Sequence, residues 1–199
     1  AVLLNITPDH LDRHRHMEEY ALSKARIMSC QTENDYTILN FDDPIVRGFK
    51  DQCPARVIYH STEQILTEGV FVENDIIKVA IPRGSWPVCP VKELSLRGKH
   101  NLENILCAVA MATAAGVEPE VIAHTLKTFP GVRHRMEQVA VKNGVMYIND
   151  SKATNPDSAI KALQSFTEPI VLIAGGRSKG SSFTDLADLI KEKVKALVL

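Results

Sequence analysis

A strand, a polar loop and a capped helix follow one another over residues 145–166, and this succession constrains the fold most strongly. Residues 145–148 (VMYI) are apolar and β-prone, which predicts a strand. Residues 157–166 are expected to form a helix, with Asn155 as its N-cap and Pro156 at the first helical position. A strand that leads into a helix is the repeating unit of α/β folds, and the polar loop between them is a usual place for a charged ligand. A loop that only caps the helix has the same composition.

The remainder of the second half continues this alternation. We expect a strand at 169–174, a helix at 183–194 and a further strand from 196, which predicts a parallel α/β sheet. Residues 137–141 and 145–148 are expected to form a hairpin around Asn143-Gly144. The glycine-rich run at 175–180 (GGRSKG) is not a Walker motif, and no G-x-x-x-x-G-K-[ST] run occurs in the 199 residues.

The first half also alternates strands and helices. Strands are expected at 1–6, 35–40, 56–60, 70–73, 76–81 and 94–96, helices at 16–30, 102–115 and 119–128, and a loop at 82–90. The strands at 70–73 and 76–81 should form a hairpin around Asn74-Asp75. Phe129-Pro130-Gly131 interrupts the pattern, so we place a domain boundary there and predict two domains, 1–131 and 132–199.

The composition is that of an ordinary globular protein. The chain is 45% hydrophobic and 24% charged with a formal net charge of −1, which gives no electrostatic case for nucleic acid or a membrane surface. No apolar run approaches the roughly 20 residues that a membrane span needs. The four cysteines are scattered without a C-x-x-C pair, which favours a reducing cytoplasm over a disulfide framework or a zinc site.

Two further segments carry candidate ligand-binding residues. Residues 7–14 (TPDHLDRH) bring two aspartates and two histidines together after a strand, which suits a divalent cation or a phosphate, although a polar helix start has the same pattern. Asn101 and Asn104 lie one helical turn apart, so both amides can face one nucleobase, while N-capping by Asn101 fits equally well. Lys24, late in its helix, would ordinarily only complement the helix dipole.

Four segments, in order along the chain, resemble motifs of the Mur ligases, ATP-dependent amide ligases of peptidoglycan synthesis. They are residues 5–14 (NITPDHLDRH), 98–104 (GKHNLEN), 131–137 (GVRHRME) and 149–155 (NDSKATN). The last segment is similar to that of the members that add D-glutamate to UDP-N-acetylmuramoyl-L-alanine. The resemblance implies the second half of a central P-loop-type ATPase domain followed by the first half of a Rossmann-like C-terminal domain. It also implies an internal fragment that is inactive alone, cut from a cytoplasmic, monomeric enzyme.

The resemblance implies a role for ten residues. His10 and Lys24, the latter carbamylated, would hold Mg²⁺. The residues that would bind ATP are His100, Asn101 and Asn104 at adenine, Arg135 at phosphate and Asp150 at ribose. The residues that would line the D-glutamate side are Lys152, Thr154 and Lys179. His10, Lys24 and Arg135 would act directly in the transfer of phosphate.

Two alternatives remain open on the sequence. Another ligase of the same superfamily, of the folylpolyglutamate synthetase type, is disfavoured by the Ser-Lys-Ala-Thr-Asn run at 151–155. A non-catalytic nucleotide-binding module of ligase ancestry is disfavoured by the combination of Asp9, His10, Arg135 and Asp150.

Overall fold

The computed structural model describes residues 1–7, 16–96, 98–176 and 183–199 and divides the chain into two compact units. Unit 1 comprises Ala1–Leu94 and Asn101–Thr128, and unit 2 comprises Ser95–His100 and Phe129–Leu199. The predicted sites at His10 and Lys179 lie outside the described residues. Among the described helices, none has the length and apolar character that a membrane crossing requires.

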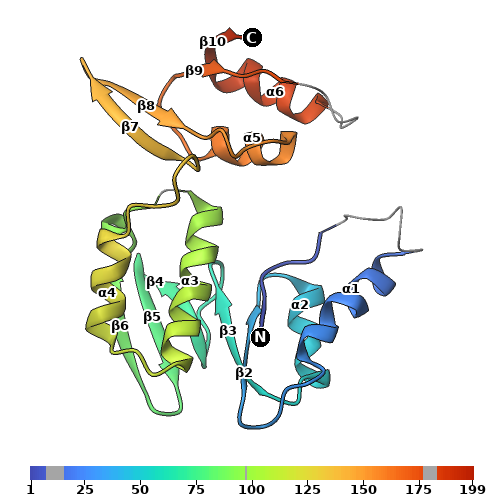
Figure 1. The fold of residues 1–199 in the computed structure, drawn as a ribbon. Coiled ribbons are helices and arrows are strands. Elements are labelled where there is room, and N and C mark those ends of the chain that lie inside the picture. The colour runs from blue at the N-terminus through green and yellow to red at the C-terminus, as the bar shows by residue number, and fades with distance from the viewer. Residues whose placement is uncertain (8–15, 97, 177–182) are drawn as a thin grey trace. The chain divides into compact units, whose positions relative to one another are not determined.

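Unit 1 contains a six-stranded sheet in simple sequential order (Figure 1). Its strands are β1 (Val2–Leu3), β2 (Tyr36–Asn40), β3 (Arg56–Ser61), β4 (Gly69–Glu73), β5 (Ile76–Ile81) and β6 (Gly84–Pro90). Strands β1 to β4 pair in parallel, whereas β5 and β6 are antiparallel to their neighbours. The carboxyl ends of β1, β2 and β3 therefore lie at one edge, where parallel sheets usually bind ligands.

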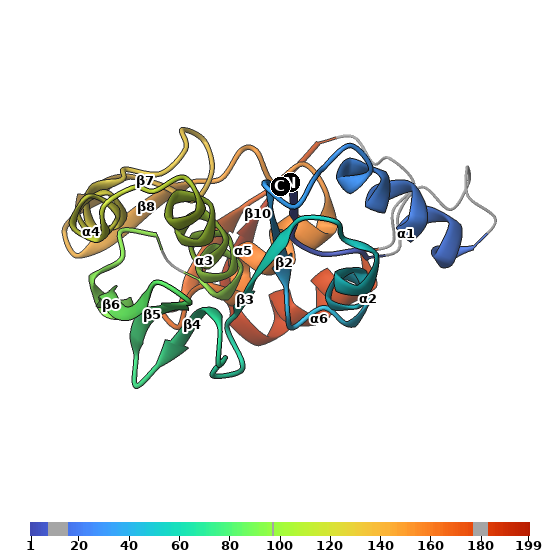
Figure 2. The same cartoon turned by 90° about the horizontal axis from the view of Figure 1, so that it is seen from below.

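Helices cover this sheet in two pairs. They are α1 (Met17–Ala25), α2 (Pro44–Gly48), α3 (Lys99–Ala114) and α4 (Pro119–Thr128), with short 3₁₀ turns at Arg26–Met28, Phe49–Gln52 and Val91–Glu93. In both views α3 and α4 run side by side beside β4, β5 and β6, away from α1 and α2 (Figures 1 and 2). Tyr20 of α1 and Val46 of α2 pack into one core cluster with Leu39 of β2. Burial of such side chains is the main favourable term in folding.

Two strands meet at the predicted Asn74-Asp75 turn, which confirms the hairpin of β4 and β5. Asn74 and Asp75 have φ values of 51° and 59°, as a two-residue turn of the mirror-image type requires. The loop predicted at 82–90 is wrong, because residues 84–90 form β6. Pro87 and Pro90 are tolerated there because β6 lies at the edge of the sheet, and the register shifts between Ile77 and Lys78 opposite them.

In its described residues, unit 2 contains two two-stranded sheets and two complete helices. Its elements are β7 (Glu137–Lys142), β8 (Val145–Asn149), α5 (Pro156–Gln164), β9 (Ile170–Ile173), α6 (Thr184–Lys193) and β10 (Val194–Val198). The hairpin of β7 and β8 is confirmed, with Asn143 and Gly144 at positive φ, and β9 and β10 pair in parallel as expected. The single parallel sheet is only partly realised, because β8 pairs with β7 rather than with β9 in the described chain.

Local capping of α5 follows the sequence prediction closely. Asn155 Oδ1 accepts a hydrogen bond from the Ser158 N–H at 2.8 Å, and Pro156 occupies the first turn.

The strand expected at 94–96 is absent from the described residues; Leu94 follows a 3₁₀ turn, and Ser95 and Leu96 form a bend. With its mixed parallel and antiparallel strands and covering helices, the fold is mixed α/β, as predicted.

Candidate active site

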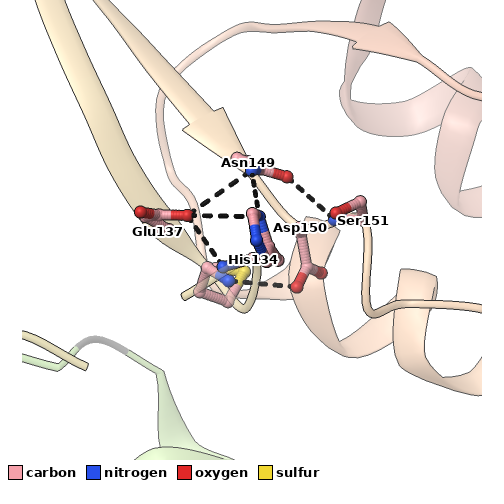
Figure 3. Close-up of polar contacts among 6 residues, drawn as sticks. His134, Glu137, Asn149, Asp150 and Ser151 are labelled. Carbon is pink, nitrogen blue, oxygen red and sulfur yellow. Dashed lines mark hydrogen bonds and ion pairs between the residues drawn. The ribbon is translucent and has the colours of Figure 1, made fainter. Parts of the chain in front are cut away.

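The loop after β8 and the turn before β7 lie against each other in unit 2 (Figure 3). The backbone N–H of Met136 donates to Asp150 Oδ1 at 3.0 Å, and the N–H of Lys152 donates to the His134 carbonyl at 3.0 Å. Arg135, between these two contacts, is exposed, as is Lys152. Three predicted site residues, Arg135, Asp150 and Lys152, are thus brought together by hydrogen bonds between neighbouring backbone segments.

Three side chains connect the same turn and loop. Asn149 Nδ2 lies 2.9 Å from His134 Nδ1 and 3.4 Å from Glu137 Oε2. Glu137 Oε2 also accepts from the His134 N–H at 2.7 Å, and Asn149 Oδ1 accepts from the Ser151 N–H at 3.1 Å. We did not predict roles for His134, Glu137 or Asn149, although all three lie within the family-like segments. Their contacts depend on the pairing of β7 with β8, where Glu137 lies opposite Asn149.

His100, in the first turn of α3, lies in the electrostatic field of this region of unit 2. Burial lowers the pKa of His100, and the positive charges of Arg135 and Lys161 lower it further, while Asp150 opposes them. Lys161 lies on α5, Asp150 on the loop after β8 and Arg135 on the turn before β7, and the charges of all three influence the pKa of the His100 imidazole. A field set by Arg135 and Lys161 is suited to an anionic ligand such as a nucleotide phosphate.

Gly98 allows the backbone conformation that leads into the start of α3 and His100. Its φ is +96°, and an added Cβ would meet Ser165 Oγ at 2.6 Å and the His100 Cε1 at 3.0 Å. A glycine is required here because no other residue fits both the backbone conformation and the space. Ser95 Oγ, earlier in the same segment, donates to the Phe129 carbonyl at 2.5 Å.

Two of the predicted adenine contacts are in unit 1. Asn101 is buried and Asn104 is exposed, both within the first turns of α3. The alternative that Asn101 caps this helix is wrong, since α3 already begins at Lys99. Amides on successive turns of one helix remain able to face a common ligand, because they project from the same side.

Lys24 lies near the carboxyl end of α1 in unit 1. It is exposed, and its Nζ lies 5.2 Å from the centre of the Tyr20 ring, a cation–π distance. An ammonium group cannot ligate Mg²⁺, so the implied metal role requires carbamylation of Lys24. Its implied partner, His10, is outside the described residues. Within the described chain no group of three His, Cys, Asp or Glu side chains is arranged to hold a metal.

A crevice of about 460 Å³ lies in unit 1 just beyond the carboxyl ends of β1 and β2. Asn5, Asn40, Asp42, Asp43, Glu63 and Glu103 provide its polar lining. Asp42 and Asp43 serve the fold there: Asp42 Oδ2 accepts from the Thr62 N–H at 2.7 Å, and Asp43 Oδ2 from the Ile6 N–H at 2.8 Å. Both carboxylates therefore have structural partners within unit 1.

Known proteins match both units of the chain. Residues 1–112 match the family described as "Mur ligase middle domain", and residues 134–199 match "Mur ligase, glutamate ligase domain". A UDP-N-acetylmuramoylalanine--D-glutamate ligase from Pelotomaculum thermopropionicum is 52% identical over 198 residues, which cover 100% of this chain and 44% of that relative. The chain therefore spans less than half the length of this relative.

Solved structures agree on the fold. A crystal structure of MurF from Acinetobacter baumannii matches with a TM-score of 0.73 at 22% identity, over 98% of this chain and 45% of that one. The apo form of L. casei FPGS matches with a TM-score of 0.65 at 16% identity, over 98% of this chain and 48% of that one. From the family matches to both of its units, this chain belongs to the Mur ligase family.

Proposed function

We propose that the full-length protein adds D-glutamate to UDP-N-acetylmuramoyl-L-alanine in an ATP-dependent ligation. The observation that carries the proposal is that the turn with Arg135 and the loop with Asp150 are hydrogen-bonded to each other, through the Met136 N–H and Asp150 Oδ1. The joined turn and loop can then offer a guanidinium to a phosphate and a carboxylate to ribose hydroxyls. The name of the relative that is 52% identical supports D-glutamate as the amino acid.

The reaction would proceed in two steps. A carboxylate oxygen of the UDP substrate attacks the γ-phosphorus of ATP, ADP leaves, and an acyl phosphate forms. The D-glutamate nitrogen then attacks the acyl carbon, a tetrahedral oxyanion forms, and phosphate leaves as the nitrogen loses a proton. Negative charge develops in both steps, so the chemistry calls for fixed cationic groups near the phosphate.

We assign the residues of this chain to those demands. Arg135 would contact the phosphate, Asp150 the ribose, and His100, Asn101 and Asn104 the adenine. Lys152, Thr154 and Lys179 would bind D-glutamate, whose two carboxylates suit ammonium and hydroxyl groups. Mg²⁺, when bound, neutralises phosphate charge, and His10 with carbamylated Lys24 would hold it. Residues 1–131 would belong to the central ATP-binding domain and 132–199 to the C-terminal domain of a cytoplasmic, monomeric enzyme.

The test uses the full-length protein with ATP, Mg²⁺ and UDP-N-acetylmuramoyl-L-alanine. We expect phosphate release with D-glutamate to exceed that with L-glutamate, L-lysine, meso-diaminopimelate or D-alanyl-D-alanine by at least about 100-fold. L-lysine and D-alanyl-D-alanine lack the second carboxylate and leave its binding groups unpaired, whereas L-glutamate and meso-diaminopimelate cannot place the amine and both carboxylates at the same three points. Product mass identifies the new amide. Preferred turnover of another amino acid, or of a folate acceptor with L-glutamate, would refute the assignment. The 199-residue chain alone should show no turnover, because it contains no Walker lysine.

A further inference from the structure

We propose that Glu137 and Asn149 are positioning residues that hold Arg135 and Asp150 in their working orientation. The inference rests on the proposed function, because it takes Arg135 and Asp150 as the groups that meet the nucleotide. We name His134, Glu137 and Asn149 the turn clamp. Figure 3 shows the three side chains converging at the point where β7 begins and β8 ends.

The backbone around Arg135 explains why a clamp is needed. His134 and Met136, on either side of it, have φ values of +65° and +47°. The left-handed region is costly for residues with a Cβ, and two such residues within three positions persist only where the surroundings hold them. Relaxation of either residue would rotate the chain at Arg135 and move its guanidinium.

A hydrogen bond holds each of the two strained residues: Glu137 accepts from His134, and Asp150 accepts from Met136. Glu137 Oε2 accepts from the His134 N–H at 2.7 Å, and Asp150 Oδ1 accepts from the Met136 N–H at 3.0 Å. The His134 carbonyl accepts from the Lys152 N–H at 3.0 Å. The turn that carries Arg135 is thereby tied to the loop that carries Asp150, so the two change position together.

Asn149 closes the clamp from the opposite strand. Its Nδ2 lies 2.9 Å from His134 Nδ1 and 3.4 Å from Glu137 Oε2, and its Oδ1 accepts from the Ser151 N–H at 3.1 Å. An amide is required because one end donates to the clamp while the other end accepts from the loop. An aspartate would lose the donor and place a second carboxylate against Glu137.

Asp150 can serve both the turn and the ligand. A carboxylate has two acceptor oxygens, so Oδ1 can hold the Met136 N–H while Oδ2 faces a ribose hydroxyl. The restraint also fixes the rotamer of Asp150 before nucleotide arrives. Preorganisation of this kind lowers the cost of ordering side chains on binding.

The experiment measures kcat and KM for each substrate in the full-length protein. Glu137→Ala should lower kcat/KM for ATP on the order of tenfold, the scale of one charge-assisted hydrogen bond, and leave KM for the UDP substrate within about twofold. Glu137→Gln keeps an acceptor oxygen and should recover most of the loss. Asn149→Asp should lose at least as much as Glu137→Ala. Gln138→Ala, at the next and exposed position of β7, is the matched control and should resemble wild type.

A double-mutant cycle separates positioning from a direct role. If Glu137 acts through Arg135, the loss from Glu137→Ala should largely disappear in an Arg135→Ala background. Full additivity, or an equal rise in KM for both substrates, would overturn the proposal, and so would a wild-type-like Arg135→Ala variant. A melting temperature within a few degrees of wild type excludes global unfolding as the cause. D-glutamate turnover by the wild type is scored separately, so a wrong amino acid assignment is distinguishable from a wrong clamp.

Discussion

His60 is a histidine buried in the middle of a sheet, and it illustrates how position overrides residue type. Its side chain is fully buried, and neither ring nitrogen has a hydrogen-bond partner among the described residues. Burial lowers the pKa of His60 to about 4, while the nearby Asp42 carboxylate opposes the shift. The folded protein therefore contains neutral His60 under conditions where the unfolded chain binds a proton.

This difference makes stability depend on pH. Between pH 6.5 and about 4 the unfolded chain holds more protons at this position than the folded chain, so the free energy of unfolding falls as pH falls. The contribution is at most about 3 kcal/mol. Urea titrations at pH 7.0 and 4.5, followed by the fluorescence of the single tryptophan, Trp86 in unit 1, would measure it. His60→Leu should flatten the dependence; an unchanged slope would contradict this account.

At the scale of elements, the short helix α2 depends on one carboxylate. Asp43 Oδ1 accepts from the N–H groups of Ile45 and Val46, both at 2.9 Å, which caps the helix. Its Oδ2 accepts from the Ile6 N–H at 2.8 Å, beyond the end of β1. A five-residue helix is too short to be stable by itself. The Asp43 carboxylate therefore stabilises both the start of α2 and the segment that follows β1.

Removal of this carboxylate should destabilise unit 1 more than the loss of an ordinary cap. Asp43→Ala should lower the free energy of unfolding by about 2–3 kcal/mol, since it removes the cap and leaves the Ile6 N–H without its acceptor. Asp43→Asn keeps one acceptor oxygen and should cost roughly half as much. Asp51→Ala, at an exposed position of the following 3₁₀ turn, is the control. Equal stability of Asp43→Ala and the control, by urea titration, would show that the cap is dispensable.

At the scale of the whole molecule, the two units differ in how much apolar surface they bury. Of the buried hydrophobic side chains in the described chain, Leu163 is the one that belongs to unit 2. Several strand residues of unit 2 are largely exposed, among them Val141 at 61%, Val171 at 62% and Ile173 at 80%. Since burial of apolar area supplies most folding free energy, unit 2 of the 199-residue chain should be the less stable.

Hydrogen exchange tests this difference directly. In the 199-residue chain, the amides of β7 to β10 should exchange at least about 100-fold faster than those of β2 to β5, because local opening of a unit with little core costs less free energy. Mass spectrometry of peptic fragments resolves the two sets. In the full-length protein, protection of β9 and β10 should rise if further chain covers their exposed apolar residues. Equal protection of both units in the 199-residue chain would refute the prediction.

The sequence predicted those features that depend on neighbours along the chain. Asn155 and Pro156 fixed the start of α5, Asn74-Asp75 and Asn143-Gly144 fixed two hairpins, and helix α4 matched its predicted bounds. Sequence periodicity gave wrong predictions where contacts with distant parts of the chain determine the structure. Residues 84–90 contain two prolines and form a strand, because pairing with β5 at the edge of the sheet tolerates them. The sequence pattern predicts that α3 begins at residue 102 with Asn101 as a candidate cap, whereas the helix begins three residues earlier, at Lys99.

The features of the candidate site likewise divide into those that the sequence predicts and those that only the tertiary structure determines. The sequence by itself determined the family, because its motifs are ordered runs of chemically specific side chains, and the resemblance implied ATP contacts for Arg135 and Asp150 and a D-glutamate contact for Lys152. Tertiary structure alone decided how they meet. The register of β7 with β8 places Glu137 opposite Asn149, and the two positive-φ residues beside Arg135 contact the loop after β8 through the Met136 N–H to Asp150 and the Lys152 N–H to the His134 carbonyl. Such contacts join residues more than ten positions apart, and no local pattern specifies their geometry.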